Sequence, residues 1–384
     1  MNHWITGFDK DKVTTILSWT VYLFVNLIFC IKYNPFGGSA VWYILVAYPA
    51  LVWGAFRLTR YKNMRQSKYF FMLVAAFILA LAFLLMRFID KYTVDVDRWS
   101  ALAFWSENLK NGLFPYGTPT HRGGYASPYP VWQLFHFPFH LLGDTGYGQL
   151  FCLFVFFLFL YVNSARLNGG GFILLLALSP GFWWEASVRS DLLCNMLLLY
   201  LFVSSLFYCR LQARHSYAVA IAAGLFLCTK MLVAIPLFLF LFPYFLRLPG
   251  RKKFCFALLV AAGATVPFLP FLFGEQGLLN HPEYNPILQQ TRQGNTGVAA
   301  LLSALIVWAS FKWKSRRDYF FLSGLFLFLL IASVGIEITW RANLAYTLFG
   351  DEFDVSYLNV SIPFFLFCIN EKKACREAEN QVLI

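Results

Sequence analysis

Long runs without a charged side chain constrain this chain more than any other feature. Residues 13–31, 40–56, 69–86 and 254–273 contain no Asp, Glu, Lys or Arg. Each run has the roughly 17 to 25 residues that a helix needs to cross about 30 Å of hydrocarbon. Apolar residues make up 59% of the chain and charged residues only 13%. A soluble protein does not need so large an apolar fraction to form its core. We therefore expect an all-α polytopic membrane protein, with residues 1–384 in a single transmembrane domain.

The basic residues predict the topology. They gather at 57–68, 247–253, 312–317 and 372–376, between apolar stretches. Because cytoplasmic loops of membrane proteins are enriched in Lys and Arg, we place these four segments in the cytoplasm. The spans between them then come in pairs, which predicts a bundle of about 12 transmembrane helices with both termini in the cytoplasm. The net charge of +12 follows from this topology, so we expect no nucleic acid partner.

Two apolar stretches, 172–208 and 217–246, are too long for one span and short for two. The predicted topology requires each stretch to cross the membrane twice. The chain would then reverse at 189–191 and at Lys230, close to the outer interface. A charge held at that depth is costly unless it has a partner.

Three outer segments are long, polar and rich in Gly and Pro, and we expect the active-site face to be formed by them: 90–146, 274–297 and 338–354. Within the first segment, residues 97–111 carry Trp and Leu at helical spacing with charged residues between them. Residues 131–142 are apolar again but too short to span. We predict that both segments are helices lying in the membrane interface.

The motif Asp95-Val96-Asp97 follows the third apolar run by a few residues. Two carboxylates at the outer interface could accept a proton as a general base, or hold sugar hydroxyls or a divalent ion. A structural alternative is that one of them caps the helix that follows, since Asp is a preferred N-cap residue.

Several basic residues lie on the outer side against the topological trend: Arg122, Arg189, Lys230, Arg292 and Arg341. A lipid-linked phosphate is a natural partner for a cation at the membrane boundary, and the cation would stabilise that phosphate as a leaving group. The alternative for Arg189 and Lys230 is an internal ion pair with Asp191 or Glu185.

The aromatic, proline-rich loop 112–132 offers Tyr116 and Tyr125 as flat faces on which a sugar can stack. Tyr and Trp also gather at any membrane interface, so an anchoring role is the alternative. His121 in the same loop could contact a phosphate or donate a proton. The eight cysteines have no Cys-x-x-Cys spacing and no pair in an outer loop, so we expect neither disulfides nor a cysteine metal site.

In this order, the motifs resemble the integral-membrane glycosyltransferases of the GT-C class. Within that class, the chain is most similar to the family of GPI mannosyltransferase I catalytic subunits. The similarity rests on Tyr92-Thr93, Asp95-Val96-Asp97, residues 112–116 (GLFPY), Tyr129-Pro130, Ser187-Val188-Arg189-Ser190, and Lys230 followed by Pro236. It extends over residues 92–246.

The resemblance implies a GT-C-like bundle that transfers a hexose, with mannose favoured, from a polyprenyl-phosphate sugar to a glycan or lipid-linked acceptor on the non-cytoplasmic face. Asp95 or Asp97 would be the general base. Arg189, Lys230, Arg122 and His121 would bind the donor phosphate. The candidate substrate contacts are Tyr116, Tyr125, Glu185, Asp191 and Arg292.

This mechanism requires no cofactor, and the acidic pair leaves room for a divalent metal. The partners would be the lipid-linked donor, the acceptor and membrane lipid, with an accessory subunit neither predicted nor excluded. A bacterial inner membrane is favoured over the endoplasmic reticulum. The main alternative is a transporter or flippase for a lipid-linked or sugar substrate, followed by an outer-face polysaccharide polymerase or ligase.

Overall fold

A computed structural model describes residues 9–34, 40–61, 67–164, 167–208, 215–291 and 295–371. These residues are helical, with turns and loops between the helices and no strand within the described ranges. They form two compact units, each made from segments that are distant in sequence. Unit 1 comprises residues 1–78, 157–184 and 313–384, and unit 2 comprises 79–156 and 185–312.

Within the described ranges, five helices are long and apolar enough to cross a membrane: Lys10–Lys32, Val41–Thr59, Lys68–Phe88, Gly250–Leu272 and Arg316–Arg341. The four uncharged runs lie in these helices apart from the end residues Ala40 and Phe273, so the prediction of long apolar helices there is confirmed. Six further apolar helices of 10 to 17 residues accompany them. Their composition indicates a protein of the membrane, and the predicted number of about 12 crossings stays a prediction.

Unit 1 is built on α1, α16 and the carboxyl-terminal helices, which pack against one another. The bounds of its helices are α1 Lys10–Lys32, α2 Val41–Tyr61, α7 Gly169–Ala177, α16 Arg316–Arg341, α17 Leu344–Phe349, η7 Val355–Ser361 and α18 Ile362–Asn370. Three helices contribute residues to both units: α3 Lys68–Phe88, α6 Tyr147–Val162 and α8 Pro180–Val188.

A break that the sequence did not predict separates α7 from α8, whose axes are bent by 68°. Pro180 begins α8 and has no backbone N–H to continue the helix. Side chains of α1 and α2 bond the backbone at the break. The Tyr22 hydroxyl donates to the Leu175 carbonyl at 2.7 Å, and the Tyr48 hydroxyl to that of Leu178 at 3.1 Å. Non-helical backbone between apolar helices is thereby satisfied internally.

Unit 2 holds the first and second predicted outer segments and the helices between them. Its helices are α4 Arg98–Lys110, α5 Pro130–Leu141, α9 Leu192–Tyr208, α10 Ser216–Leu227, η4 Met231–Val233, α11 Ala234–Arg247, α12 Gly250–Thr265, η5 Val266–Phe268, α13 Leu269–Leu272, η6 Pro282–Tyr284, α14 Pro286–Thr291 and α15 Thr296–Ser310. The predicted reversal points are confirmed as helix ends, because residues 189–191 separate α8 from α9 and Lys230 separates α10 from α11.

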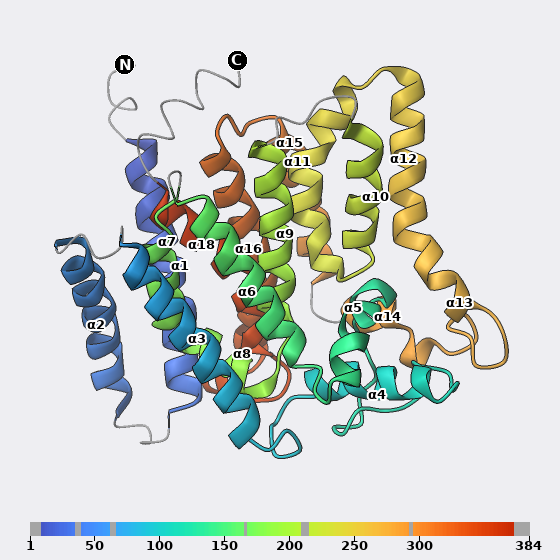
Figure 1. Cartoon of the computed structure of the whole chain (residues 1–384), viewed down its shortest axis with the longest axis horizontal. Coiled ribbons are helices and arrows are strands. Elements are labelled where there is room, and N and C mark those ends of the chain that lie inside the picture. Colours follow the sequence, from blue (N-terminus) through green and yellow to red (C-terminus); the bar gives the residue numbers. More distant parts are fainter. Residues whose placement is uncertain are drawn as a thin grey trace. The chain divides into compact units, whose positions relative to one another are not determined.

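Helices α10 and α12 lie side by side in unit 2 (Figure 1). Gly224 on α10 and Gly263 on α12 allow this close approach, because neither has a side chain. A Cβ on Gly224 would lie 2.5 Å from the Val260 carbonyl oxygen, and one on Gly263 would lie 3.0 Å from the Gly224 Cα. Such contacts between small residues are typical of helices packed within a membrane.

The helices predicted at 97–111 and 131–142 are confirmed as α4 and α5, and their position in the membrane interface stays a prediction. Trp99, Leu102 and Trp105 are each only 1% exposed, since α4 packs against α5 and neighbouring loops. These large side chains therefore belong to the protein core and do not themselves contact lipid.

Candidate functional site

A buried ion pair lies where α8 ends and α10 ends. The Lys230 ammonium is 2.9 Å from Oδ2 of Asp191, and the two side chains are 7% and 3% exposed. The indole Nε1 of Trp132 on α5 donates to the same carboxylate oxygen at 2.6 Å. The predicted alternative for Lys230, an internal pair with Asp191, is therefore what the structure contains.

Arg98, the first residue of α4, adds a second cation to this pair. Burial alone would raise the pKa of the Asp191 carboxyl, but the charges of Lys230 and Arg98 outweigh burial and hold that pKa below its ordinary value. Burial lowers the pKa of the Lys230 ammonium below its ordinary value, although Asp191 opposes the shift. We call Arg98, Asp191 and Lys230, with Trp132, the charge cluster.

Glu185 and His136 lie beside the charge cluster. Glu185 is fully buried, and its Oε2 accepts a hydrogen bond from the Leu193 backbone N–H at 3.0 Å, which ties the start of α9 to α8. His136 is 2% exposed, and burial lowers its pKa to about 4. Its imidazole is therefore neutral at physiological pH, and no further positive charge is added there.

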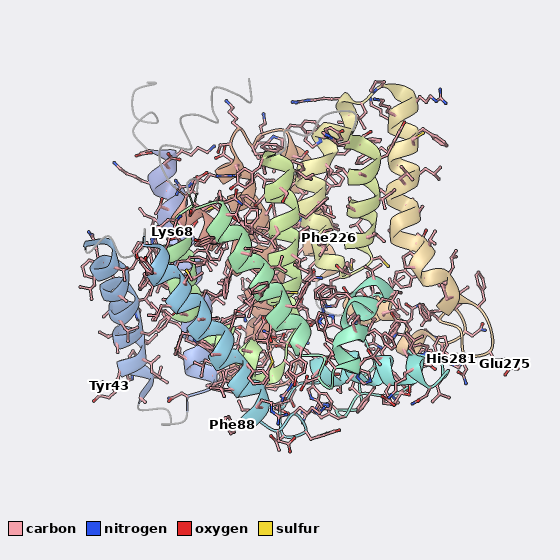
Figure 2. The ribbon with its side chains drawn as sticks, in the orientation of Figure 1. Tyr43, Lys68, Phe88, Phe226, Glu275 and His281 are labelled. Atoms are coloured by element: carbon pink, nitrogen blue, oxygen red, sulfur yellow. The ribbon has the colours of Figure 1, made fainter. Side chains whose placement is uncertain are left out.

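Arg189 is not part of the charge cluster. Its Nε donates to Asp144 Oδ2 at 3.0 Å, and its Nη2 donates to the backbone carbonyls of Met86 and Ile89. These carbonyls belong to the carboxyl end of α3, which the labelled Phe88 marks in Figure 2. Arg189 has a φ of 55°, the one positive φ among the described non-glycine residues. It acts as a brace on the end of α3, with its guanidinium occupied by protein oxygens.

Asp95 pairs with Arg122 in an exposed position. The Arg122 Nη2 is 2.5 Å from Asp95 Oδ1, and the side chains are 50% and 76% exposed. An ion pair in water contributes little to stability, so either partner can be given up to a ligand at small cost. The structure thus brings a predicted base and a predicted phosphate contact directly together.

Asp97 occupies the N-cap position of α4, but its side chain makes no capping hydrogen bond. Its Oδ2 instead accepts a hydrogen bond from the Thr120 hydroxyl at 3.0 Å. The chain of the loop comes close at Gly124, where a Cβ would lie 2.9 Å from the same oxygen. Oδ1 receives no hydrogen bond from the described residues. The capping alternative is therefore wrong for this side chain, which faces the loop with one oxygen available.

His121 has both ring nitrogens in contact with protein. Its Nδ1 is 2.8 Å from the Ser100 hydroxyl, and its Nε2 is 3.3 Å from the Val94 carbonyl oxygen. The ring packs on Trp99 with 5.1 Å between centroids. These contacts fix the loop over the start of α4, and a role in phosphate binding would require one of them to break.

The two candidate tyrosines differ in accessibility. Tyr116 is fully buried, donates to the Pro128 carbonyl at 3.2 Å, and packs against Trp105 and Phe271. Its ring is part of the core and offers no face to a sugar in this conformation. Tyr125 is partly exposed and lies against Tyr284, with 5.6 Å between ring centroids.

The second outer segment packs onto the first. Gln290 accepts a hydrogen bond from the Met231 backbone N–H and donates to the Ser127 carbonyl, both at 2.6 Å. It therefore connects the loop to the residue after Lys230. In the same second segment, the His281 Nε2 is 2.9 Å from the Glu275 carbonyl oxygen, and both residues are labelled in Figure 2. Parts of both segments thus share one ordered structure within unit 2.

Arg292 lies outside the described residues, so its predicted role in substrate binding stays a prediction. Among the residues that the structure describes, no three His, Cys, Asp or Glu side chains gather into a group that could hold a metal ion. The six described cysteines are free thiols.

Sequence reasoning missed Arg98, Trp132, His136 and Asp144. Arg98 could have been recognised from the sequence, because it is a further basic residue on the predicted outer side, directly after Asp97. The pairing of Asp144 with Arg189 joins residues 45 positions apart and has no local signature. The bond from Trp132 to Asp191 joins residues 59 positions apart and has no local signature either.

Comparison of the chain with family models, with curated proteins and with solved structures gave no match. The resemblance to the GT-C class therefore stays a prediction, and the site has to be argued from its own geometry.

Proposed function

We propose that the protein is a membrane glycosyltransferase that moves a hexose, with mannose favoured, from a polyprenyl-phosphate donor to a glycan or lipid-linked acceptor. The reaction would be inverting and need no cofactor. Asp97 is the proposed general base, and Lys230 with Arg98 the proposed site for the donor phosphate. Arg98 is paired with Lys230 in this proposal because its charge acts on both Asp191 and Lys230, whereas the Arg189 guanidinium lies outside the charge cluster and donates to Asp144 and Ile89.

One observation carries the proposal: a carboxylate with an available oxygen stands directly before a cation of the charge cluster. Asp97 keeps Oδ1 free of described donors, and the next residue, Arg98, acts electrostatically on both Asp191 and Lys230. Transfer of a sugar from a lipid phosphate needs a base on one side of the anomeric carbon and positive charge on the other. Adjacent residues at the start of α4 supply both kinds of group.

The chemical step balances without an external reactant. Asp97 takes the proton of the acceptor hydroxyl as its oxygen attacks the anomeric carbon. The bond from that carbon to the phosphate oxygen breaks, and the electron pair leaves with the polyprenyl phosphate. Lys230 and Arg98 neutralise the charge that develops on the phosphate, which then competes with Asp191 for Lys230.

The membrane context of this proposal follows the charge distribution of the chain. We place the charge cluster on the non-cytoplasmic face, with about 12 crossings and both termini in the cytoplasm. A bacterial inner membrane fits the short loops. Asp95 and Arg122 form an exposed pair that could contact the acceptor.

The test is transfer of radiolabelled sugar in membranes that express the protein. Polyprenyl-phosphate-mannose and polyprenyl-phosphate-glucose are supplied with candidate acceptors, and wild type is compared with Lys230→Met and Asp97→Asn. We expect transfer by the wild type, and its loss in both variants at equal expression. Transfer that is unaffected by Asp97→Asn would refute the proposed base.

A transporter or flippase is the second candidate, and the broken helix α7–α8 is the observation that favours it. Interrupted helices bind substrate in many secondary transporters. At this break, buried Asn26 accepts hydrogen bonds from the Ser179 hydroxyl at 2.6 Å and from the Gly181 N–H at 3.2 Å. Uptake or flipping of a lipid-linked sugar that persists in Asp97→Asn, without any transfer, would establish this candidate instead.

A further inference from the structure

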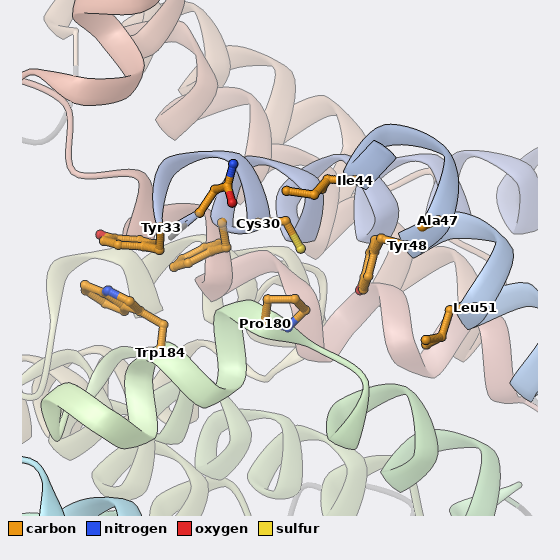
Figure 3. Close-up of a pocket in the computed structure, with 10 residues that line it drawn as sticks. Cys30, Tyr33, Ile44, Ala47, Tyr48, Leu51, Pro180 and Trp184 are labelled. Atoms are coloured by element: carbon orange, nitrogen blue, oxygen red, sulfur yellow. The ribbon is translucent and has the colours of Figure 1, made fainter. Parts of the chain in front are cut away.

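Unit 1 contains an apolar groove that the proposed function does not use. It has a volume of about 430 Å³ and lies between the carboxyl end of α1, the first half of α2 and the start of α8. Figure 3 shows Cys30 of α1, Tyr48 of α2 and Pro180 of α8 around it. The volume is in the range of pockets that hold small molecules in proteins.

None of the described residues that line the groove carries a charge. Its walls are aliphatic and aromatic apart from Cys30, Asn34 and two tyrosine hydroxyls. The Tyr48 hydroxyl already donates to the Leu178 carbonyl at the break between α7 and α8. A polar or charged ligand would lose its hydration here without gaining partners, so the groove suits a hydrocarbon.

The surroundings of the groove indicate where that hydrocarbon comes from. Both α1 and α2 are long and apolar enough to span a membrane, so the groove lies between two candidate spans. Aromatic rings collect at the α1 carboxyl end, where Tyr33 and Trp184 lie 5.4 Å apart between centroids. Trp42 and Tyr43 at the start of α2 are 75% and 78% exposed. Such rings are typical of the boundary between hydrocarbon and lipid head groups.

Helix α2 packs little against the other described helices. Only 6% of its membrane-spanning window is buried, and among the described helices it packs mainly against α1 and α7. Pro49 within α2 removes one backbone hydrogen bond donor from the helix interior. A ligand wedged between α1, α2 and α8 would therefore supply contacts that protein does not.

We propose that this groove binds one acyl chain of a membrane phospholipid, whose head group stays among the aromatic residues at the α1 carboxyl end. The ligand is a zwitterionic bulk lipid, whose head group carries its own cation, and not the anionic lipid-linked donor, whose phosphate would need a cation that the described lining residues do not supply. The bound chain fastens α2 to the rest of unit 1.

The test uses two matched substitutions on α2. Ala47 and Ala50 are both exposed on α2, but Ala47 lines the groove and Ala50 does not. Ala47→Trp fills the groove, and Ala50→Trp adds the same side chain elsewhere on the helix. Each protein is purified in mild detergent, incubated with phosphatidylethanolamine that carries a photoreactive diazirine on one acyl chain, and irradiated.

We expect cross-links in the wild type on residues 29–34 and 44–51, and about tenfold fewer in Ala47→Trp, which corresponds to about 1.4 kcal/mol of binding. Ala50→Trp should label like the wild type. Equal labelling of both variants, or labelling spread over all apolar helices, would overturn the proposal.

Competition distinguishes the lipid sources. Unlabelled phosphatidylethanolamine should suppress the cross-link, and polyprenyl phosphate at the same concentration should not suppress it more strongly. Stronger suppression by polyprenyl phosphate would overturn the assignment to a bulk lipid. Since this experiment needs no sugar transfer, its outcome is independent of the proposed enzymatic function.

Discussion

Arg189 and Lys230 look alike in the sequence and differ in the structure. Each follows an apolar helix at the point where the chain turns, and each is buried. Arg189 reaches Asp144 and the end of α3, with a guanidinium that has oxygen acceptors on several sides. Among the described residues, Lys230 has one ion-pair partner, Asp191, and a second cation nearby.

The difference separates a structural cation from one that can exchange its partner. Removing Arg189 exposes backbone carbonyls and a carboxylate at once, and no single ligand can replace its contacts. In the proposed mechanism Lys230 exchanges Asp191 for the donor phosphate, and no described backbone contact of Lys230 is lost. A basic residue at a membrane boundary is therefore a candidate phosphate ligand only where its partner is exchangeable.

Arg189→Ala should cause the largest loss of stability. It leaves Asp144 Oδ2 and the carbonyl of Ile89 without the Arg189 donor, and breaking a buried pair of this kind costs about 3–5 kcal/mol. Thermal unfolding in detergent measures the loss. Arg189→Lys should recover only part of it, because one ammonium cannot reach the same set of acceptors. An unchanged unfolding midpoint in Arg189→Ala would contradict the bracing role.

Lys230→Met should also destabilise the protein, by about 3 kcal/mol, because it leaves Asp191 buried without its lysine. The double variant Asp191→Asn/Lys230→Met should recover most of that stability. The amide oxygen of the substituted asparagine can still accept from Trp132, and the pair no longer leaves an unpaired carboxylate. Sugar transfer should stay lost.

The matched double variant Asp144→Asn/Arg189→Met should recover far less stability than the Asp191/Lys230 double variant, because the α3 carbonyls still lack a donor. Equal recovery in both double variants, measured by thermal unfolding, would remove the distinction between the two cations.

Stability should also depend on pH through His136, beside the Lys230 region. The folded pKa of about 4 lies below the ordinary value of 6.5. The unfolded chain therefore binds a proton that the folded protein does not. The shifted pKa of His136 therefore contributes at most about 3 kcal/mol to the free energy of unfolding. That contribution is fully present above pH 6.5 and is lost as pH falls toward 4. Unfolding midpoints between pH 7 and 4.5 measure it, and His136→Gln should flatten the slope.

Two glycine substitutions should give the smallest effects and act on different properties. A Cβ on Gly146 would meet the Arg189 side chain at 2.9 Å and Asp144 at 3.1 Å, so Gly146→Ala should lower stability by about 1–2 kcal/mol with little effect on transfer. Gly124→Ala would meet Asp97 Oδ2 at 2.9 Å and should slow transfer with little effect on unfolding. The reverse pattern would contradict the assignment of roles.

The sequence was sufficient for the four long apolar helices and for the helix ends at residues 189–191 and Lys230, because uncharged runs and isolated charges are local signals. It was insufficient for the break at residues 178–179, which lies within an apolar stretch marked only by Ser179-Pro180. It could not separate Arg189 from Lys230, since their partners Asp144 and Asp191 are determined by tertiary packing. It also could not show that Tyr116 is buried, because tyrosines in a proline-rich loop look alike until the loop folds.

Asp95 and Asp97 likewise could not be ranked from the sequence. The structure places Asp95 in an exposed pair with Arg122 and Asp97 beside the first residue of the charge cluster. The two residues are close in the chain and differ in what they face, so replacing each in turn tests the central claim with a control inside the same motif.

The most direct measurement is therefore the rate of sugar transfer from polyprenyl-phosphate-mannose by Asp97→Asn and Asp95→Asn at equal expression. We predict that Asp97→Asn loses transfer by about 10²-fold or more, as expected for a general base, whereas Asp95→Asn keeps a substantial part of it. Full transfer by Asp97→Asn would contradict the account.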